Sequence, residues 1–113
     1  MTKNIRNSTI IKIPVRSGQK IYVPNGDLII INNVNAGAEI IASGNIHIYG
    51  RMSGRALAGA KGDVSSHIFC LNLCSELISI SGIYLVKEKI PKEFMGKTMN
   101  IFLKDGILTM NKI

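Results

Sequence analysis

The chain has 113 residues, 46% of them hydrophobic, which is enough to bury the core of one domain without disulfides or a structural metal. It contains no apolar run of about 18 residues that would span a membrane, and its N-terminus lacks the apolar segment of a secretory signal, so we expect a cytoplasmic protein. The net charge of +7 raises the question of nucleic acid, but the lysines of the C-terminal third alternate with Glu88, Glu93 and Asp105, so we expect no nucleic-acid partner.

The N-terminal stretch, residues 1–14, is polar, carries no hydrophobic period and ends in Pro14. Such composition is typical of a chain terminus that is not held by a core. We interpret residues 1–14 as the flexible remnant of a linker. The ordered domain is therefore predicted at residues 15–113.

Short apolar segments separated by Gly, Asn or Ser follow one another from residue 15 to about residue 84. Within them hydrophobic residues alternate with a period of two, which indicates strands, and the pattern restarts roughly every eight to ten residues. Glycines suited to corners, small alanines, and near-repeats over residues 33–50 and 51–70 favour a solenoid of parallel coils of roughly 18 to 20 residues. On this pattern alone, a meander or a sandwich of short strands stays open as an alternative.

The side chains that carry chemistry give little support for an enzyme. Cys70 and Cys74 lie in an apolar stretch without the neighbours that a zinc site needs, so we expect buried free thiols and no metal. His47 should point away from the isoleucines that flank it, onto a polar outer face, and neither His47 nor His67 has a nucleophile or carboxylate nearby in the sequence. A hexapeptide-repeat acyltransferase is the catalytic alternative, but strict hexapeptide steps are missing. We therefore expect a protein without catalysis or cofactor.

Six short motifs occur together in a fixed order along the chain. They are residues 16–19 (RSGQ), 26–28 (GDL), 33–50 (NVNAGAEIIASGNIHIYG), 54–63 (GRALAGAKGD), 68–70 (IFC) and 76–82 (ELISISG). With these motifs the chain resembles the C-terminal domains of MinC proteins, a family that regulates where bacteria divide. The resemblance covers residues 15 to about 110.

The resemblance implies a fold and a function. The fold is all-β, a right-handed parallel β-helix of triangular cross-section that dimerises through one flat face. The function is that of a docking and dimerisation domain of a cell-division inhibitor, which binds the membrane-associated ATPase MinD and helps target FtsZ to block septum formation at wrong sites. The domain would be cytoplasmic, would reach the inner face of the membrane only through MinD, and would act without the N-terminal FtsZ-antagonist domain of full-length family members. The alternative is a structural, polymer-forming β-helix protein of the bactofilin type.

The resemblance also implies the functional residues. MinD binding falls on one loop and one glycine, namely Arg16, Ser17, Gly18, Gln19 and Gly37. A guanidinium, a hydroxyl, an unhindered backbone and an amide in one loop suit polar recognition, whereas the alternative is an ordinary turn. Arg55, flanked by small residues, is expected to bind the acidic tail of FtsZ, and its alternative is a surface arginine that covers the edge of its own coil.

A homodimer is expected from the flat faces of the solenoid. Period-two alternation leaves some apolar side chains on the outside, and we expect Leu73, Leu77 and Ile83 among them. An outward apolar face is a typical surface for a symmetric dimer.

Overall fold

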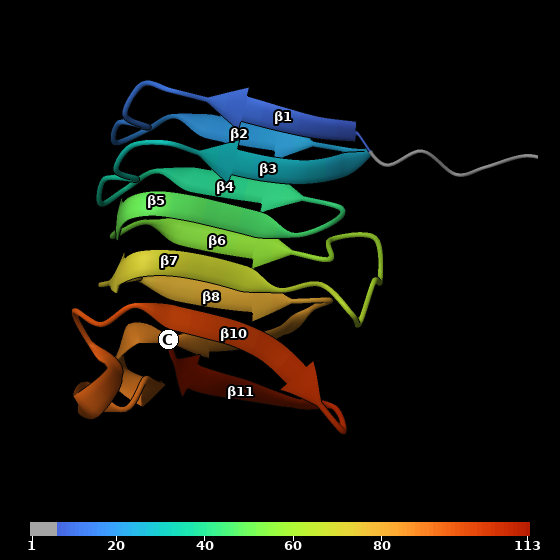
Figure 1. The fold of residues 1–113 in the computed structure, drawn as a ribbon, viewed down its shortest axis with the longest axis vertical. Coiled ribbons are helices and arrows are strands. Elements are labelled where there is room, and N and C mark those ends of the chain that lie inside the picture. Colours follow the sequence, from blue (N-terminus) through green and yellow to red (C-terminus); the bar gives the residue numbers. More distant parts are fainter. Residues whose placement is uncertain (1–6) are drawn as a thin grey trace, which may run out of the picture.

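The computed structural model describes residues 7–113 and has the form of a β-solenoid, in which the strands from β1 to β8 alternate between two facing sheets (Figure 1). From β1 to β8, each strand pairs in parallel with the strand after next. Followed from the N-terminus, the chain winds with a right hand (Figure 1). The prediction of an all-β, right-handed parallel β-helix is therefore confirmed.

The strands form two sheets and a narrow third side. Sheet A has the order β1 (Asn7–Ile11), β3 (Gly26–Ile30), β5 (Ile46–Met52), β7 (Ile68–Leu73), β10 (Met99–Lys104) and β11 (Ile107–Lys112). Sheet B has the order β2 (Lys20–Val23), β4 (Glu39–Ala42), β6 (Arg55–Ala58), β8 (Leu77–Ile80) and β9 (Ile83–Val86). On the third side, isolated parallel bridges join Val15 to Val34 and Val34 to Met52. The cross-section therefore has three sides, as the resemblance implies.

The coils are unequal in length. In sheet A, Ile46 pairs with Leu28 and with Ile68, and hydrogen bonds between the neighbouring residues span 18 and 22 positions of the sequence. In sheet B, Arg55 pairs with Glu39, only 16 residues earlier. The longest coil holds its additional residues in the loop between β6 and β7 (Figure 1). The predicted period of roughly 18 to 20 residues is thus an average over coils of different length.

Alternation along the strands fills the interior. Leu28 and Ile30 of β3 are fully buried. In β4, Ile40 is fully buried, whereas its neighbours Glu39 and Ile41 are only half-buried. Sheet B also contributes the small buried residues Ala42 and Ala56, so large and small side chains share the space between the sheets. One continuous core results, and it positions the turns that connect the sheets.

Antiparallel structure closes the C-terminal end of the solenoid. β9 returns along β8 through Ser81 and Gly82, and β11 returns along β10 through Asp105 and Gly106. All four turn residues have positive φ, as type I′ hairpins require. The 3-10 helices η1 (Lys87–Lys89) and η2 (Lys92–Phe94) join the two hairpins, and within residues 7–113 no helix is long and apolar enough to cross a membrane. The closure interrupts the parallel stacking on which a polymer-forming β-helix would depend, so it weakens that alternative.

The N-terminal boundary differs from the expected one. β1 lies inside the stretch interpreted as a linker remnant, and its five residues pair in register with β3, from Asn7 with Gly26 to Ile11 with Ile30. Residues 1–6 of that stretch lie outside the described residues. β1 is the edge strand at the open end of the solenoid, and all five of its residues are exposed or half-buried, so its segment NSTII lacks the hydrophobic alternation that indicates a strand.

Candidate protein-docking site

Two similar turns lie one above the other where the chain passes from the third side into sheet B. In the first, the amide of Gln19 donates to the carbonyl of Arg16 over 3.0 Å, and in the second the amide of Ala38 donates to the carbonyl of Asn35 over 3.1 Å. The third residue of each turn is a glycine with positive φ, +84° at Gly18 and +82° at Gly37. These values define type II turns, in which a residue with a side chain would be strained at that position.

The two turns hold each other in place. The amide of Gly18 donates to the carbonyl of Gly37 over 2.9 Å, and a Cβ atom at Gly37 would overlap the hydroxyl of Ser17. Within the first turn, the amide of Arg16 donates to the Oε1 atom of Gln19 over 2.7 Å. The structure therefore brings together the five residues that the resemblance assigns to MinD binding, and all five are exposed.

Arg55 lies at the same edge of sheet B. The register of β2, β4 and β6 aligns Lys20, Glu39 and Arg55 in one row, directly after the stacked turns. The Nη2 atom of Arg55 lies 3.4 Å from the Oε2 atom of Glu39, and the Arg55 side chain is 48% exposed. A guanidinium held by one carboxylate on a surface retains donors for a second one. Glu39 was not identified from the sequence, because only the short 16-residue step places it beside Arg55.

Glu76 is a second acidic residue that the sequence did not indicate. Its carboxylate Oε1 atom accepts the amide of Gly37 over 2.6 Å, although the two residues are 39 positions apart. The side chain reaches past Gly54, which has no side chain and whose carbonyl accepts the amide of Glu76 over 3.0 Å. The outward-directed amide of Gly37 in the second turn thus has a carboxylate as its acceptor.

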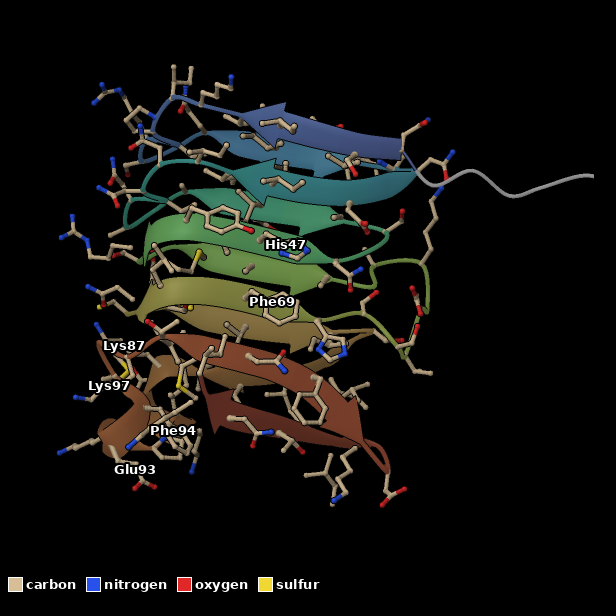
Figure 2. All side chains as sticks on the ribbon, in the orientation of Figure 1. His47, Phe69, Lys87, Glu93, Phe94 and Lys97 are labelled. Atoms are coloured by element: carbon tan, nitrogen blue, oxygen red, sulfur yellow. The ribbon has the colours of Figure 1, made fainter. Side chains whose placement is uncertain are left out.

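The outer face of sheet A carries a ladder of stacked rings. His47 lies 4.9 Å from Phe69 between ring centroids, Phe69 lies 5.4 Å from His67, and His67 lies 5.3 Å from Phe102. His47 and Phe69 lie one below the other on β5 and β7 (Figure 2). His47 points outward as predicted, but the prediction of a polar face is wrong, because aromatic rings cover it. Desolvation lowers the pKa of His47, while Asp27 raises it and His67 lowers it further.

Apolar side chains extend this outer face. About half of each of Ile31, Tyr49 and Leu71 is exposed, and Ile113 is 73% exposed. Tyr49, Leu71 and Ile113, together with His47, Phe69 and neighbouring residues, line a shallow groove of about 340 Å³. This outward apolar surface agrees with the expected flat face, but it involves other residues than those predicted.

The residues expected on the outside take three different positions. Leu73 is fully buried, so the prediction that it points outward is wrong. Leu77 is half-buried and Ile83 is 39% exposed, and both belong to sheet B. The register shift in the pairing of β5 with β7 places two outward residues, Leu71 and Asn72, in succession, and this turns Leu73 into the core.

The cysteines are free thiols. Cys70 is buried, and burial raises the pKa of its thiol to about 12. Cys74 is half-buried rather than buried, and its thiol donates to the Oδ1 atom of Asn72 over 3.2 Å. A thiol with a raised pKa is a poor nucleophile, so Cys70 acts as part of the core.

Comparisons with known proteins agree with the motifs. Residues 9–113 match the family model described as septum formation inhibitor MinC, C-terminal domain. A probable septum site-determining protein MinC from Buchnera aphidicola subsp. Acyrthosiphon pisum is 57% identical over 109 residues, which are 96% of this chain and 46% of the relative. The corresponding protein of Proteus mirabilis is 53% identical, over 97% of this chain and 48% of the relative. The chain thus spans about half the length of the curated relatives it matches.

A solved structure has the same fold. A chain of the MinC:MinD cell division protein complex of Aquifex aeolicus superposes with a TM-score of 0.85 at 29% sequence identity. The match covers 95% of this chain and 87% of the other. The likeness therefore extends over nearly the whole chain.

Proposed function

Since this chain belongs to the family of MinC C-terminal domains, we propose that it is the docking and dimerisation domain of a cell-division inhibitor, which binds MinD and helps target FtsZ. The observation that carries this proposal is the pair of stacked turns, which presents the RSGQ residues together with Gly37. The likeness to a chain from a MinC:MinD complex supports MinD as the partner. Recruitment from the cytoplasm to the inner face of the membrane would then follow from MinD.

The chemistry of the stacked turns suits a protein surface. Arg16 offers a planar group of five donors, and Ser17 and Gln19 add groups that both donate and accept. The backbone beneath them is held by the hydrogen bonds from Gly18 to Gly37 and from Arg16 to Gln19, so little conformational freedom is lost when a partner binds. A polar, pre-ordered and exposed loop is the kind of site at which a few residues supply most of the affinity.

A second partner fits the Arg55 row. An acidic tail peptide of FtsZ would bring carboxylates to the exposed guanidinium of Arg55 and the ammonium of Lys20, which lies in the same row. Glu39 lies between these cations and holds Arg55 in place. The site is contiguous with the stacked turns, so both partners would approach the same edge of sheet B.

Dimerisation would use the outer face of sheet A. Its half-exposed apolar residues and its ladder of rings form a flat, weakly charged surface, and burying it against a second copy removes apolar area from water. A symmetric dimer places the same patch on both subunits, which suits a regular sheet. The docking edge of sheet B then stays accessible on each protomer.

The proposal is tested most directly by Arg16→Ala. Removing a charge-assisted hydrogen bond costs about 1.5 to 3 kcal/mol, so binding to MinD with ATP should weaken about 10- to 150-fold. Binding is measured by co-sedimentation with MinD and anionic vesicles, and folding by circular dichroism. The matched control is Lys61→Ala, an exposed cation in the loop between β6 and β7, which should bind normally. Unchanged recruitment of the folded Arg16→Ala variant would refute the docking role of the loop.

A further inference from the structure

We propose that Glu76 is a positioning residue for the MinD-docking turns, although it lies 39 residues away from the glycine it holds. The inference rests on the proposed function of the Arg16–Gln19 turn. Its starting point is the 2.6 Å hydrogen bond from the amide of Gly37 to the carboxylate of Glu76. A bond to an ionised acceptor at this distance belongs to the strong class of hydrogen bonds.

The bond ends a short ladder that runs along the axis of the solenoid. In a type II turn the amide of the third residue belongs to the central peptide and is not used by the turn itself. In the first turn that amide, of Gly18, donates to the carbonyl of Gly37 in the coil below. In the second turn the equivalent amide, of Gly37, donates to Glu76. Two equivalent donors therefore have different acceptors, one from the backbone and one from a side chain.

The shortened third coil explains why a side chain is needed. Four residues separate Val34 from Glu39 in the second coil, and they form the turn, whereas only Ser53 and Gly54 separate Met52 from Arg55 in the third. The third coil thus has no equivalent turn, and no carbonyl of such a turn lies beneath the second one. Glu76 reaches up from the fourth coil and supplies the missing acceptor.

The backbone of Glu76 is held by hydrogen bonds at both its amide and its carbonyl, so the position from which its side chain extends is fixed. Its amide donates to the carbonyl of Gly54 over 3.0 Å, and its carbonyl accepts the amide of Lys87 over 2.9 Å. The adjacent Ser75 is fully buried. The carboxylate therefore extends from a rigid base, and its distance to Gly37 depends on the length of the side chain.

Glu76 acts on the docking loop through Gly37. The carboxylate of Glu76 accepts the amide of Gly37 and so fixes the orientation of the central peptide of the second turn. In that orientation Gly37 has a φ of +82°, and its lack of a side chain leaves room for the hydroxyl of Ser17. The carbonyl of the same glycine holds Gly18. Without the carboxylate the central peptide is free to rotate, so the position of Ser17 and the support of the RSGQ turn become variable. The conformational entropy lost in ordering them would then reduce the affinity for MinD.

Two conservative substitutions separate positioning from direct contact. Glu76→Gln keeps the length and an acceptor oxygen but removes the charge, whereas Glu76→Asp keeps the charge but is one methylene too short. If Glu76 positions Gly37, MinD binding should stay within about 3-fold of wild type in Glu76→Gln and weaken about 5- to 20-fold in Glu76→Asp and Glu76→Ala. Glu88→Ala, an exposed glutamate on η1, is the control and should bind normally.

A second measurement reports on the mechanism itself. Amide hydrogen exchange at Gly18 and Gly37 should speed up in Glu76→Asp and Glu76→Ala and stay slow in Glu76→Gln, while amides of the core strands stay protected in all variants. Binding that is lost in Glu76→Gln and kept in Glu76→Asp would overturn the inference, because it would indicate a direct charge contact. Equal or tighter binding in Glu76→Ala would overturn it as well. Arg16→Ala is measured in parallel: if it weakens binding and Glu76→Ala does not, only the positioning role fails, and if Arg16→Ala has no effect, the proposed docking site fails with it.

Discussion

The outer face of sheet A and the turn-bearing edge of sheet B differ in the chemical groups that they expose. Sheet A presents rings and aliphatic side chains, such as Phe69 and Leu71, with few charges. The edge of sheet B presents backbone amides, Arg16, Arg55 and two carboxylates joined by hydrogen bonds. A surface of the first kind is stabilised by removing apolar area from water, and one of the second kind by directed polar contacts. The proposed dimer and the proposed complexes with MinD and FtsZ would therefore use separate surfaces of one solenoid.

The largest expected effect is on the apolar face. Tyr49→Asp places a carboxylate where a second copy would cover it, so the dissociation constant of the dimer should rise at least about 100-fold. Tyr22→Asp is a matched control, because Tyr22 on sheet B is 52% exposed and Tyr49 is 53% exposed. Analytical ultracentrifugation at tens of micromolar measures the oligomeric state. A wild-type monomer, or an equal loss of dimer in both variants, would contradict the assignment of sheet A.

An intermediate effect is expected at the polar edge. Arg55→Glu should weaken binding of an FtsZ tail peptide about 10- to 50-fold, because the new carboxylate lies beside Glu39 and repels an acidic ligand. Recruitment by MinD should fall much less, since Arg16 and its turn are unchanged. Fluorescence anisotropy of the labelled peptide measures the first quantity and vesicle co-sedimentation the second.

Two results would contradict this division between partners. Equal loss of both partners with an unchanged circular dichroism spectrum would mean that the sites overlap. Loss of both together with the fold would mean that Arg55 serves to cover its own coil. Arg51→Glu, which reverses an exposed arginine near the end of β5, controls for the change in net charge.

The smallest expected effect concerns pH. Burial lowers the pKa of His47 in the folded chain, so the unfolded chain takes up a proton first as the pH falls below about 6.5. The stability contributed by neutral His47 is thus present above that pH and is lost as the pH falls through the folded-state value. The urea midpoint should decrease between pH 7.5 and 5, and decrease less in His47→Gln. An identical pH dependence in both proteins would show that His47 contributes nothing to it.

The coils were predictable from the sequence because each one repeats the same local pattern. Alternation around His47 correctly placed Ile46 and Ile48 inside and His47 outside, and an ordinary turn was the alternative considered for residues 16–19. The C-terminal closure was missed, although Asp105–Gly106 is a strong signal for a type I′ hairpin. Leu73 was misplaced because simple alternation does not foresee the register shift opposite Arg51.

The two glutamates at the docking edge could not be predicted, because their contacts depend on coil lengths. A uniform coil of roughly 18 to 20 residues would place Arg55 beside residues 35–37 rather than Glu39. The contact of Glu76 with Gly37 likewise requires the third coil to be short. Small insertions and deletions that the periodic pattern averages out therefore decide which side chains meet.

The C-terminal closure carries part of the positive net charge of the chain. Lys87, Lys89, Lys92 and Lys97 are all exposed on the helices η1 and η2 and the segment that follows them, and Lys87, Glu93, Phe94 and Lys97 lie close to this end of the solenoid (Figure 2). The four lysines outnumber the exposed Glu88 and Glu93 of the same helices, so two molecules that meet end to end through this closure would bring together surfaces of net positive charge. The repulsion acts within about 8 Å at physiological salt. If MinD gathers the domain at high local density on a membrane, as proposed, this repulsion would oppose the addition of one copy to the end of another.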